Sequence, residues 1–309
     1  MTREDVLRPV RRHPFALSPD PAFLCPTPAH DEALAGLVYG VRMRQGIMAL
    51  TGEVGTGKTL VLRCLMRALE RHRVLCCYLF HSLLSGEDLM RYLLAHLGEE
   101  ASQPMGKADM ILRLSSHLLR QHRAGWLPLL IIDEAQDLSP EALEEVRLLT
   151  NLETAECKLL QVVLAGQPEL DGQLDSHRLR QLKQRVAMRF HLPALNQEQT
   201  RAYVVRRLQL AGAEDVVFTP AALDRVHDVA QGIPRVINLL CGGALLLATS
   251  QQQLRIGAAM VDEVAADLRL SAAGAADAPS GAAAAAGEPG EPEWAVSSRP
   301  EAVNGGINS

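Results

Sequence analysis

The sequence predicts an α/β fold, in which a parallel sheet is flanked by helices and followed by a small all-α domain and a disordered C-terminal tail. Short, nearly continuous apolar runs alternate with amphipathic stretches over residues 46–193, as expected of parallel strands covered on both faces. Residues 194–270 carry helical patterns but no convincing strand. Hydrophobic residues make up 48% of the 309 and aromatic residues only 4%, so the core is predicted to consist of aliphatic side chains.

The first 45 residues are predicted to be extended at first and then helical. Proline fixes φ and removes a backbone donor, and prolines stand at positions 14, 19, 21, 26 and 28. Over residues 31–44, apolar side chains recur on one helical face, at Leu34, Leu37, Val38 and Val41. We therefore expect an extended segment that leads into one helix.

Residues 46–193 are predicted to form the α/β domain. The predicted strands are apolar runs at residues 46–51, 74–80, 127–133 and 159–165. The predicted intervening helices are residues 60–72, 86–98, 107–122 and 140–152. The first of these helices follows a Gly-rich loop directly.

A small helical domain is predicted over residues 194–270, with Pro193 at its boundary. Asn196 and Gln199 have the spacing of a capping box, and Thr219 precedes a proline at the first helical position. Further helices are predicted over residues 236–250 and 257–268. Residues 271–309 hold twelve alanines, six glycines and four prolines without a periodic pattern, which predicts a disordered tail.

Charge and composition limit the possible functions. The net charge is −5, and the tail alone contributes −4 (five acidic residues and one arginine), so residues 1–270 are close to neutral at −1. This weighs against a strongly basic nucleic-acid surface, although a local basic patch remains compatible with it. No apolar run approaches the roughly 18 residues that would span a bilayer, and no signal peptide is apparent. Six cysteines without a C-x-x-C pair fit a reducing compartment, so a cytoplasmic location is expected.

One motif carries the predicted chemistry. Residues 52–59 match the phosphate-binding pattern G-x-x-x-x-G-K-[ST], between an apolar strand and a helix. The glycines let successive backbone N–H groups point at phosphate oxygens, and the helix N-terminus adds positive potential. Lys58 is expected to reach the β- and γ-phosphates of ATP, and the Thr59 hydroxyl to ligate Mg²⁺. The predicted nucleotide-binding residues are Gly52, Glu53, Val54, Gly55, Thr56, Gly57, Lys58 and Thr59.

A second motif lies 75 residues further along the chain. The apolar run at residues 129–132 ends in Asp133 and Glu134. This places both acids at the carboxyl end of a buried strand, where α/β sheets bind ligands. Asp133 is expected to hold Mg²⁺, and Glu134 to polarise the attacking water. Together the two motifs predict a P-loop NTPase with Walker A and Walker B elements.

Much of the chain resembles the ATPase domain of the general secretion pathway protein A family, which belongs to the AAA+ ATPases. ATPases of MSHA-type pilus biogenesis and of exosortase loci are similar. The resemblance covers about residues 14–250 and is most specific in the segments IIDEAQDLSP, RLLTNLET and KLLQVVLAGQPEL, between residues 131 and 170. It also includes PF at 14–15, LSPDP at 17–21, FL at 23–24, residues 30–40, residues 51–59 and the segment GIPR at 232–235.

The resemblance implies roles for further residues. Gln167 takes the sensor-1 position, where a polar side chain contacts the γ-phosphate or the water, and Arg235 the sensor-2 position of the helical lid. A nucleotide that contacts Arg235 would bridge the two domains, and the N-terminal segment is expected to pack near it. An arginine finger that enters the neighbouring subunit is expected from residues 178–190. Arg185 is the preferred candidate, with Arg180 and Arg189 as alternatives.

The function that the resemblance implies is Mg²⁺-dependent ATP hydrolysis by a homo-oligomeric, hexamer-like ring. Such a ring would assemble or energise a secretion, pilus or exopolysaccharide export system together with proteins of that envelope machine. Whole members of the family continue into a transmembrane helix and a periplasmic region, whereas here the predicted tail follows. Any association with the inner face of the cytoplasmic membrane would therefore be through a partner. A DNA-associated ATPase of the transposition-regulator type and a non-enzymatic nucleotide-dependent scaffold are the alternatives.

Overall fold

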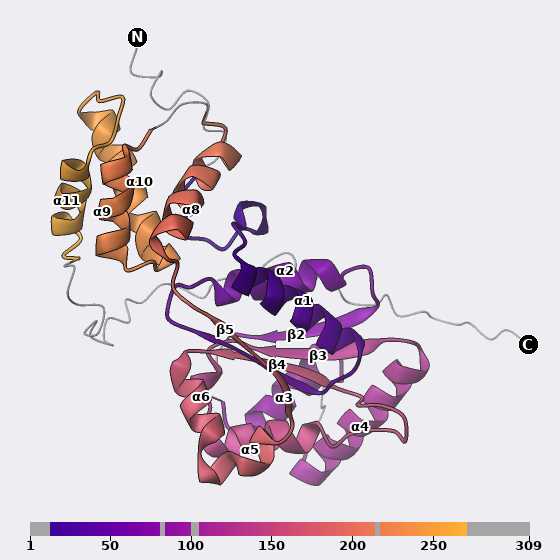
Figure 1. Ribbon diagram of the computed structural model, residues 1–309. Helices are drawn as coiled ribbons and strands as arrows, with labels where there is room; N and C mark the ends of the chain where they lie inside the picture. Colours follow the sequence, from indigo (N-terminus) through magenta and orange to yellow (C-terminus); the bar gives the residue numbers. More distant parts are fainter. Residues whose placement is uncertain (1–12, 81–83, 100–104, 214–216, 271–309) are drawn as a thin grey trace, which may run out of the picture. The chain divides into compact units, whose positions relative to one another are not determined.

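The computed structural model describes residues 13–80, 84–99, 105–213 and 217–270. Its sheet has five parallel strands in the spatial order β2-β3-β4-β1-β5 (Figure 1). The strands are β1 (Ile47–Gly52), β2 (Val74–Leu79), β3 (Leu127–Ile132), β4 (Gln161–Gly166) and β5 (Val186–Leu192). Strand β4 lies between β1 and β3, so the ends of the two motif strands flank the end of β4.

Helices cover both faces of the sheet (Figure 1). Helices α1 (Pro28–Arg42) and α2 (Lys58–Leu69) share one aliphatic core with alternate side chains of β1, β3 and β4. On the opposite face a second core joins the sheet to α3 (Gly86–His96), α4 (Lys107–Arg123), α5 (Pro140–Leu149), α6 (Pro168–Asp175) and α7 (Arg180–Lys183). The predicted fold class is confirmed, and the predicted strands and helices of this part lie within three residues of the observed ones.

The prediction of four strands is wrong by one, because β5 is a fifth strand. Every residue of β1, β3 and β4 is buried, which produces the continuous apolar runs of those strands. Along β5 (Val186–Leu192), by contrast, partly or fully buried residues alternate with exposed ones. Strand β5 pairs only with β1 within the described sheet, so it is an edge strand, and its exposed side includes Arg189 and His191. Because of these polar side chains, the sequence of β5 looks like a continuation of the basic segment before it and was not recognised as a strand.

The described part of residues 197–267 contains four helices that share one core. The helices are α8 (Gln197–Leu210), α9 (Pro220–Ala230), α10 (Pro234–Ser250) and α11 (Ala258–Asp267). The predicted capping box is present, since Asn196 Oδ1 accepts from the Gln199 N–H at 2.8 Å and Gln199 Oε1 from the Asn196 N–H at 2.9 Å. Phe15 from the N-terminal segment packs into this core.

Among the described helices, none combines the length and the apolar character that crossing a bilayer requires. The prediction of a disordered tail over residues 271–309 lies outside the described residues.

Candidate functional site

The Gly-rich loop joins β1 to α2. Strand β1 ends at Gly52, and α2 begins at Lys58. Gly55 and Gly57 have φ values of +85° and +106°, in the left-handed region that favours glycine. This curled backbone and the N-terminus of a twelve-residue helix form a structure suited to binding phosphate.

Lys58 is buried beneath this loop, with 5% of its surface exposed. Its ammonium donates hydrogen bonds to the carbonyl oxygens of Gly52 at 2.8 Å and Glu53 at 3.1 Å. Burial lowers the pKa of Lys58, whereas the nearby carboxylates of Glu134 and Asp133 act to raise it. The Lys58 side chain is thus held within the loop by its hydrogen bonds to two backbone carbonyl oxygens.

Asp133 follows β3 and is tied by three hydrogen bonds. Its Oδ2 accepts from the Thr59 hydroxyl at 2.9 Å and from the Tyr78 hydroxyl at 2.7 Å. Its Oδ1 accepts from the backbone N–H of Glu134 at 3.1 Å. Burial, together with the charge of Asp133, raises the pKa of Tyr78, so the phenol keeps its proton and remains a donor. Three elements therefore fix the orientation of one carboxylate.

The side chains of Thr59 and Asp133 suit a magnesium ion. Mg²⁺ prefers oxygen ligands and is commonly held by one or two protein oxygens together with substrate phosphates. Thr59 Oγ1 and Asp133 Oδ2 lie 2.9 Å apart at the start of α2. The two residues predicted to hold the metal are therefore neighbours beside the Gly-rich loop.

Glu134 is positioned by an unusual backbone conformation and by a glutamine. Its φ is +53°, a left-handed value that is uncommon for a residue with a Cβ. Gln136 Nε2 donates to Glu134 Oε2 at 3.0 Å, and Gln136 Oε1 accepts from the backbone N–H of Gln167 at 3.0 Å. Gln167 directly follows β4, at the N-terminus of α6. One side chain thus connects the ends of two neighbouring strands.

Arg235 approaches the loop from the start of α10. Its backbone N–H donates to the Gly55 carbonyl at 3.2 Å. A Cβ on Gly55 would lie 2.6 Å from the Arg235 Cβ, so only glycine permits this approach. The turn before α10 is equally tight, since a Cβ on Gly232 would lie 1.9 Å from the Leu195 carbonyl oxygen.

A cavity of about 390 Å³ brings many of the predicted residues together. Its walls come from the N-terminal segment, the Gly-rich loop, the end of β3, α8 and α10. The predicted residues that line it are Val54, Gly55, Gly57, Lys58, Thr59, Glu134 and Arg235. Residues 16–20 line it too. Gln167, Arg180, Arg185 and Arg189 are not among the described residues that line this cavity.

Arg207 of α8 holds the N-terminal segment against this cavity. Its guanidinium is buried and donates to the carbonyl oxygens of Pro14 and Ala16. It also donates to the Tyr203 hydroxyl at 2.8 Å, and Tyr203 donates to Asn238 Oδ1 at 3.0 Å. Tyr203, Arg207 and Asn238 all line the cavity. The network links two helices to residues almost 200 positions earlier.

His30 of α1 contacts the backbone of the Gly-rich loop. Its Nε2 lies 3.2 Å from the Thr56 carbonyl oxygen, and its Nδ1 lies 2.7 Å from the Thr27 hydroxyl. Burial lowers the pKa of His30, which favours the neutral ring. A neutral ring with the proton on Nε2 donates to Thr56 and accepts from Thr27, so both contacts are satisfied.

The arginine-finger candidates lie elsewhere. Arg180 and Arg185 line a second cavity of about 540 Å³ together with Arg147, Gln181 and Gln184. Arg189 lies on β5 and forms ion pairs with Asp175 at 3.1 Å and Asp171 at 3.6 Å. Within this described chain, the candidates are therefore separate from the cavity that contains Lys58.

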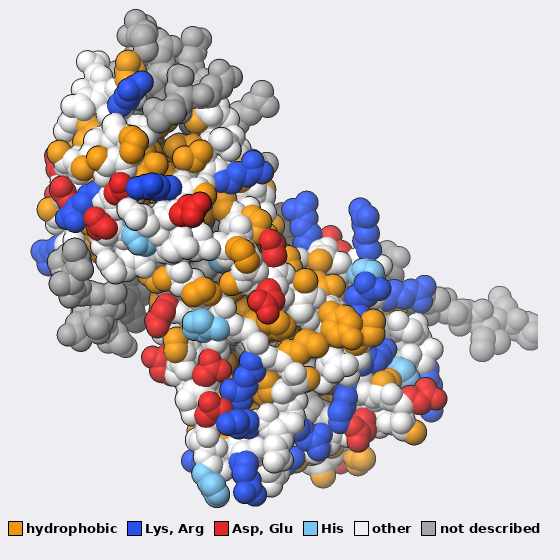
Figure 2. All heavy atoms as spheres, viewed as in Figure 1, with side chains coloured by type: hydrophobic (Ala, Val, Ile, Leu, Met, Phe, Trp, Pro, Cys, Tyr) orange, Lys and Arg blue, Asp and Glu red, His pale blue; other side chains and the backbone are white. Residues whose placement is uncertain are grey.

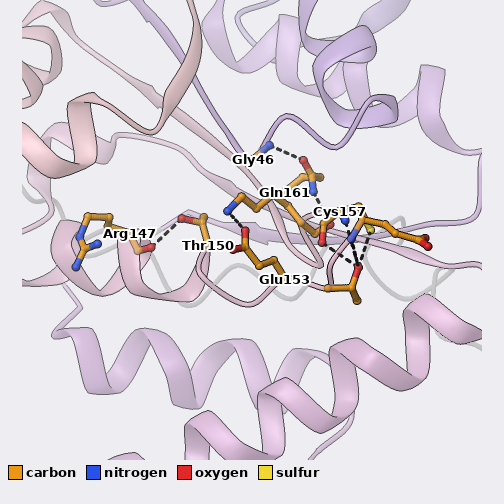
Figure 3. A network of polar contacts seen from close by, with 9 residues as sticks. Gly46, Arg147, Thr150, Glu153, Cys157 and Gln161 are labelled. Carbon is orange, nitrogen blue, oxygen red and sulfur yellow. Dashed lines mark hydrogen bonds and ion pairs between the residues drawn. The ribbon is translucent and has the colours of Figure 1, made fainter.

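Figure 3 shows polar contacts that anchor the beginning of β4, with Arg147 on the helix before them. The buried Gln161 accepts from the Gly46 N–H at 2.8 Å and donates to the Lys158 carbonyl at 3.3 Å. Lys158 pairs with Glu153, which lowers the pKa of that carboxyl group through a side-chain hydrogen bond. These contacts hold β4 against the start of β1.

Several residues of this site were not predicted. Tyr78 lies at the end of an apolar strand, and Gln136 lies two residues after Glu134, so both could have been suspected from their positions. Arg207 and His30 carry no such local signal, because their partners are distant in sequence.

Comparison with known proteins identifies the group to which the chain is similar. A model of the AAA domain matches residues 41–174. General secretion pathway protein A of Aeromonas hydrophila is 46% identical over 248 residues, which are 79% of this chain and 44% of that protein. The chain therefore spans less than half the length of this relative.

Several solved structures have a fold similar to that of this chain. The Aeropyrum pernix ORC2 protein superposes with a TM-score of 0.63 at 18% identity, over 83% of this chain and 71% of that one. Cdc6p of Pyrobaculum aerophilum gives a TM-score of 0.61 at 16% identity, over 80% and 70% of the two chains. At these identities the likeness concerns the fold alone.

Proposed function

This chain belongs to the general secretion pathway protein A family and contains an AAA domain. We propose that it hydrolyses ATP in a Mg²⁺-dependent reaction. The observation that carries the proposal is the arrangement around one cavity of Lys58, Thr59, Glu134 and Arg235, with Asp133 hydrogen-bonded to Thr59. These groups supply a cation for the phosphates, oxygen ligands for a metal and a carboxylate for water. Phosphoryl transfer requires this combination of positioning and charge stabilisation.

The chain's own groups have separate tasks in this reaction. Backbone N–H groups of residues 52–59 and the Lys58 ammonium bind the β- and γ-phosphates. Glu134 orients a water molecule and accepts its proton as the water oxygen bonds to the γ-phosphorus. The bond from that phosphorus to the β,γ-bridging oxygen breaks, and ADP and phosphate are released. Thr59 and Asp133 would hold Mg²⁺, which would supply positive charge beside the phosphates.

Gln167 and Arg235 are assigned the sensing roles in this proposal. Arg235 lines the cavity and can donate two parallel hydrogen bonds to phosphate oxygens. Gln167 lies at the end of the strand between β1 and β3, and its backbone is linked to Glu134 through Gln136. Residues 46–193 and 194–270 would then act as two domains, because a nucleotide held by both Lys58 and Arg235 couples them.

In this proposal the protein forms a hexamer-like homo-oligomer. A neighbouring subunit supplies an arginine to the ATP site. Arg180 and Arg185 face a cavity without a nearby Gly-rich loop, which suits arginines that act on a neighbouring copy. An arginine supplied by another subunit accelerates phosphoryl transfer by about 10³–10⁵. We assign this role to Arg185, which contributes to a group of three arginines at that cavity.

The biological role proposed is that of an assembly or energising factor for a secretion, pilus or exopolysaccharide export system. The relationship to general secretion pathway protein A supports this role. Its partners would be protein components of that machine, and its location the cytoplasm or the inner face of the membrane. On the face drawn in Figure 2, Lys and Arg side chains are interspersed with Asp and Glu side chains. A DNA-binding face would be predominantly basic, so this face favours the export role over a DNA-associated role.

The experiment is an ATPase assay of the purified protein with Mg²⁺, with and without duplex DNA. We expect hydrolysis that Lys58→Ala abolishes together with ATP binding, and that Glu134→Gln abolishes without loss of binding. Undiminished ATP affinity in Lys58→Ala would overturn the assignment of the phosphate site. Strong stimulation by DNA would favour the DNA-associated alternative.

A further inference from the structure

The short helix after Glu134 contains a glutamine whose side chain has two defined hydrogen-bond partners. Gln136 lies in η2 (Ala135–Asp137), which begins immediately beyond Glu134. Its Nε2 donates to Glu134 Oε2 at 3.0 Å, and its Oε1 accepts from the Gln167 N–H at 3.0 Å. We infer that Gln136 is a positioning residue for Glu134, an inference that rests on the proposed ATPase function.

The orientation of the Gln136 amide is defined by these partners. A carboxylate only accepts hydrogen bonds and a backbone N–H only donates. If the amide were turned by 180°, its oxygen would face the carboxylate oxygen of Glu134, and its NH₂ group would face the N–H of Gln167. Both contacts would then be repulsive. Only one orientation satisfies both partners, so the side chain acts as a directional link between them.

Two further contacts lie beside the link. Gln173 Nε2 donates to the Gln136 backbone carbonyl oxygen at 2.7 Å, a contact between α6 and η2 that involves neither end of the Gln136 side-chain amide. Gly166 provides room, because a Cβ at that position would lie 2.8 Å from Gln136 Oε1. The close passage of β4 beneath Gln136 therefore depends on the absence of a side chain at residue 166.

Glu134 needs such support because its backbone is in a left-handed conformation, with φ of +53°. A residue with a Cβ adopts this conformation at an energetic cost, and its side chain leaves the chain in an unusual direction. The contact with Gln136 restrains the far end of that side chain. A carboxylate held in this way can orient a water molecule with less loss of conformational freedom.

The link also connects Glu134 to the end of β4. Gln136 Oε1 accepts a hydrogen bond from the backbone N–H of Gln167, the residue proposed to sense the γ-phosphate. A shift of the Gln167 backbone is transmitted through one rigid amide to the carboxylate. Gln136 thus makes the position of Glu134 depend on the nucleotide-sensing end of the neighbouring strand.

Two variants remove the link in different ways. Gln136→Met keeps a similar length and removes both hydrogen bonds. Gln136→Glu keeps an acceptor for Gln167 but removes the donor to Glu134. In both we expect kcat for ATP hydrolysis to fall at least tenfold while KM and ATP affinity change less than twofold. This division is expected of a residue that acts after substrate has bound.

Gln173→Met is the matched control. It removes a hydrogen bond to the same short helix but does not reach Glu134. We expect its kcat to stay within twofold of the unsubstituted protein. Thermal unfolding and ATP binding identify any variant that is simply unfolded. A decrease in Gln173→Met equal to that in Gln136→Met would indicate a structural role and overturn the inference.

A double substitution tests whether Gln136 acts through Glu134. Added to Glu134→Gln, Gln136→Met should change the residual single-turnover rate less than twofold, because the carboxylate that it positions is gone. A further tenfold loss would contradict the inference, as would normal kcat in Gln136→Met and Gln136→Glu. If Glu134→Gln retained full activity, the proposed function of Glu134 would fail instead, and the two failures are thereby distinguished.

Discussion

The Tyr78 hydroxyl donates a 2.7 Å hydrogen bond to Asp133 Oδ2, the same oxygen that accepts from the Thr59 hydroxyl. Tyr78 is buried near the end of β2, and Asp133 follows the neighbouring strand β3. The orientation of the proposed metal-binding carboxylate is therefore set partly by a strand that carries neither nucleotide motif.

Tyr78→Phe is expected to weaken Mg²⁺ binding three- to tenfold. Without the phenol, Asp133 keeps its contacts with Thr59 and the Glu134 N–H but gains rotational freedom. We expect a stability loss of about 1 kcal/mol, as for one buried hydrogen bond. Titration with Mn²⁺ by electron paramagnetic resonance in the presence of a non-hydrolysable ATP analogue measures the affinity. Tyr92→Phe is the control, because that hydroxyl donates at 2.9 Å to the Tyr78 carbonyl oxygen and not to Asp133. Equal metal affinity in Tyr78→Phe and the unsubstituted protein would contradict the prediction.

The buried His30 predicts a dependence of stability on pH. Burial lowers its pKa in the folded state, although Asp31 acts in the opposite direction. The unfolded chain therefore binds a proton more readily, and the free energy of unfolding should decline as the pH falls below about 6.5. The decline should continue until the pH reaches the lower pKa of the folded state.

Urea denaturation at pH 5 and pH 7 tests this dependence. His30→Gln should lose less stability between these pH values than the unsubstituted protein, because its amide does not titrate. His96→Gln, at an exposed position of α3, serves as the control and should leave the pH dependence unchanged. An identical pH dependence in His30→Gln would show that His30 does not contribute.

Arg207 is expected to be critical for stability. Its guanidinium donates to two backbone carbonyls and lies 5.1 Å from the ring centroid of Phe23. Arg207→Met leaves buried acceptors unpaired, so we expect a loss of about 2–4 kcal/mol in the free energy of unfolding. Arg207→Lys should restore little of it, since an ammonium cannot reach these partners in the planar guanidinium geometry.

The control for this prediction is the exposed neighbour Arg206. Arg206→Met should change the unfolding free energy by no more than about 0.5 kcal/mol, as is usual for surface positions. Urea denaturation measures both variants. If Arg207→Met were as stable as Arg206→Met, the network around residues 14–16 would contribute nothing measurable.

Arg185→Ala is expected to bind ATP normally but to turn it over roughly 10³-fold more slowly, because this arginine is proposed to act on a neighbouring subunit. Mixing it with Glu134→Gln should restore part of the activity. At some interfaces of the mixed assembly, an intact Arg185 then meets an intact Glu134.

Arg189→Ala is the control for the finger, since Arg189 already pairs with Asp171 and Asp175. Its turnover should stay close to that of the unsubstituted protein. If mixing Arg185→Ala with Glu134→Gln restored nothing while Arg180→Ala with Glu134→Gln did, the role would pass to Arg180. Turnover per molecule that does not depend on protein concentration would argue against any arginine supplied by a second subunit.

Local patterns were sufficient to predict the Gly-rich loop and four of the five strands, of which β1, β3 and β4 are wholly buried. A phosphate-binding loop needs glycines at fixed spacing between a strand and a helix, and all of these features are contiguous in the chain. Strands such as β3 are buried on both faces and so appear as unbroken apolar runs. Strand β5 escaped prediction because it exposes every second residue, unlike the other edge strand β2, and its alternation was obscured by the arginines before and within it.

Tertiary packing alone decided the connections within the site. The placement of β4 between β1 and β3, the bond from Tyr78 to Asp133 and the attachment of Arg207 to Pro14 join residues 32 to 193 positions apart. No local spacing rule relates such pairs, because their proximity arises only when the sheet and helices bury their shared apolar surface. The sequence motifs therefore indicate which groups are proposed to perform the chemistry, whereas the packed fold determines which side chains contact them.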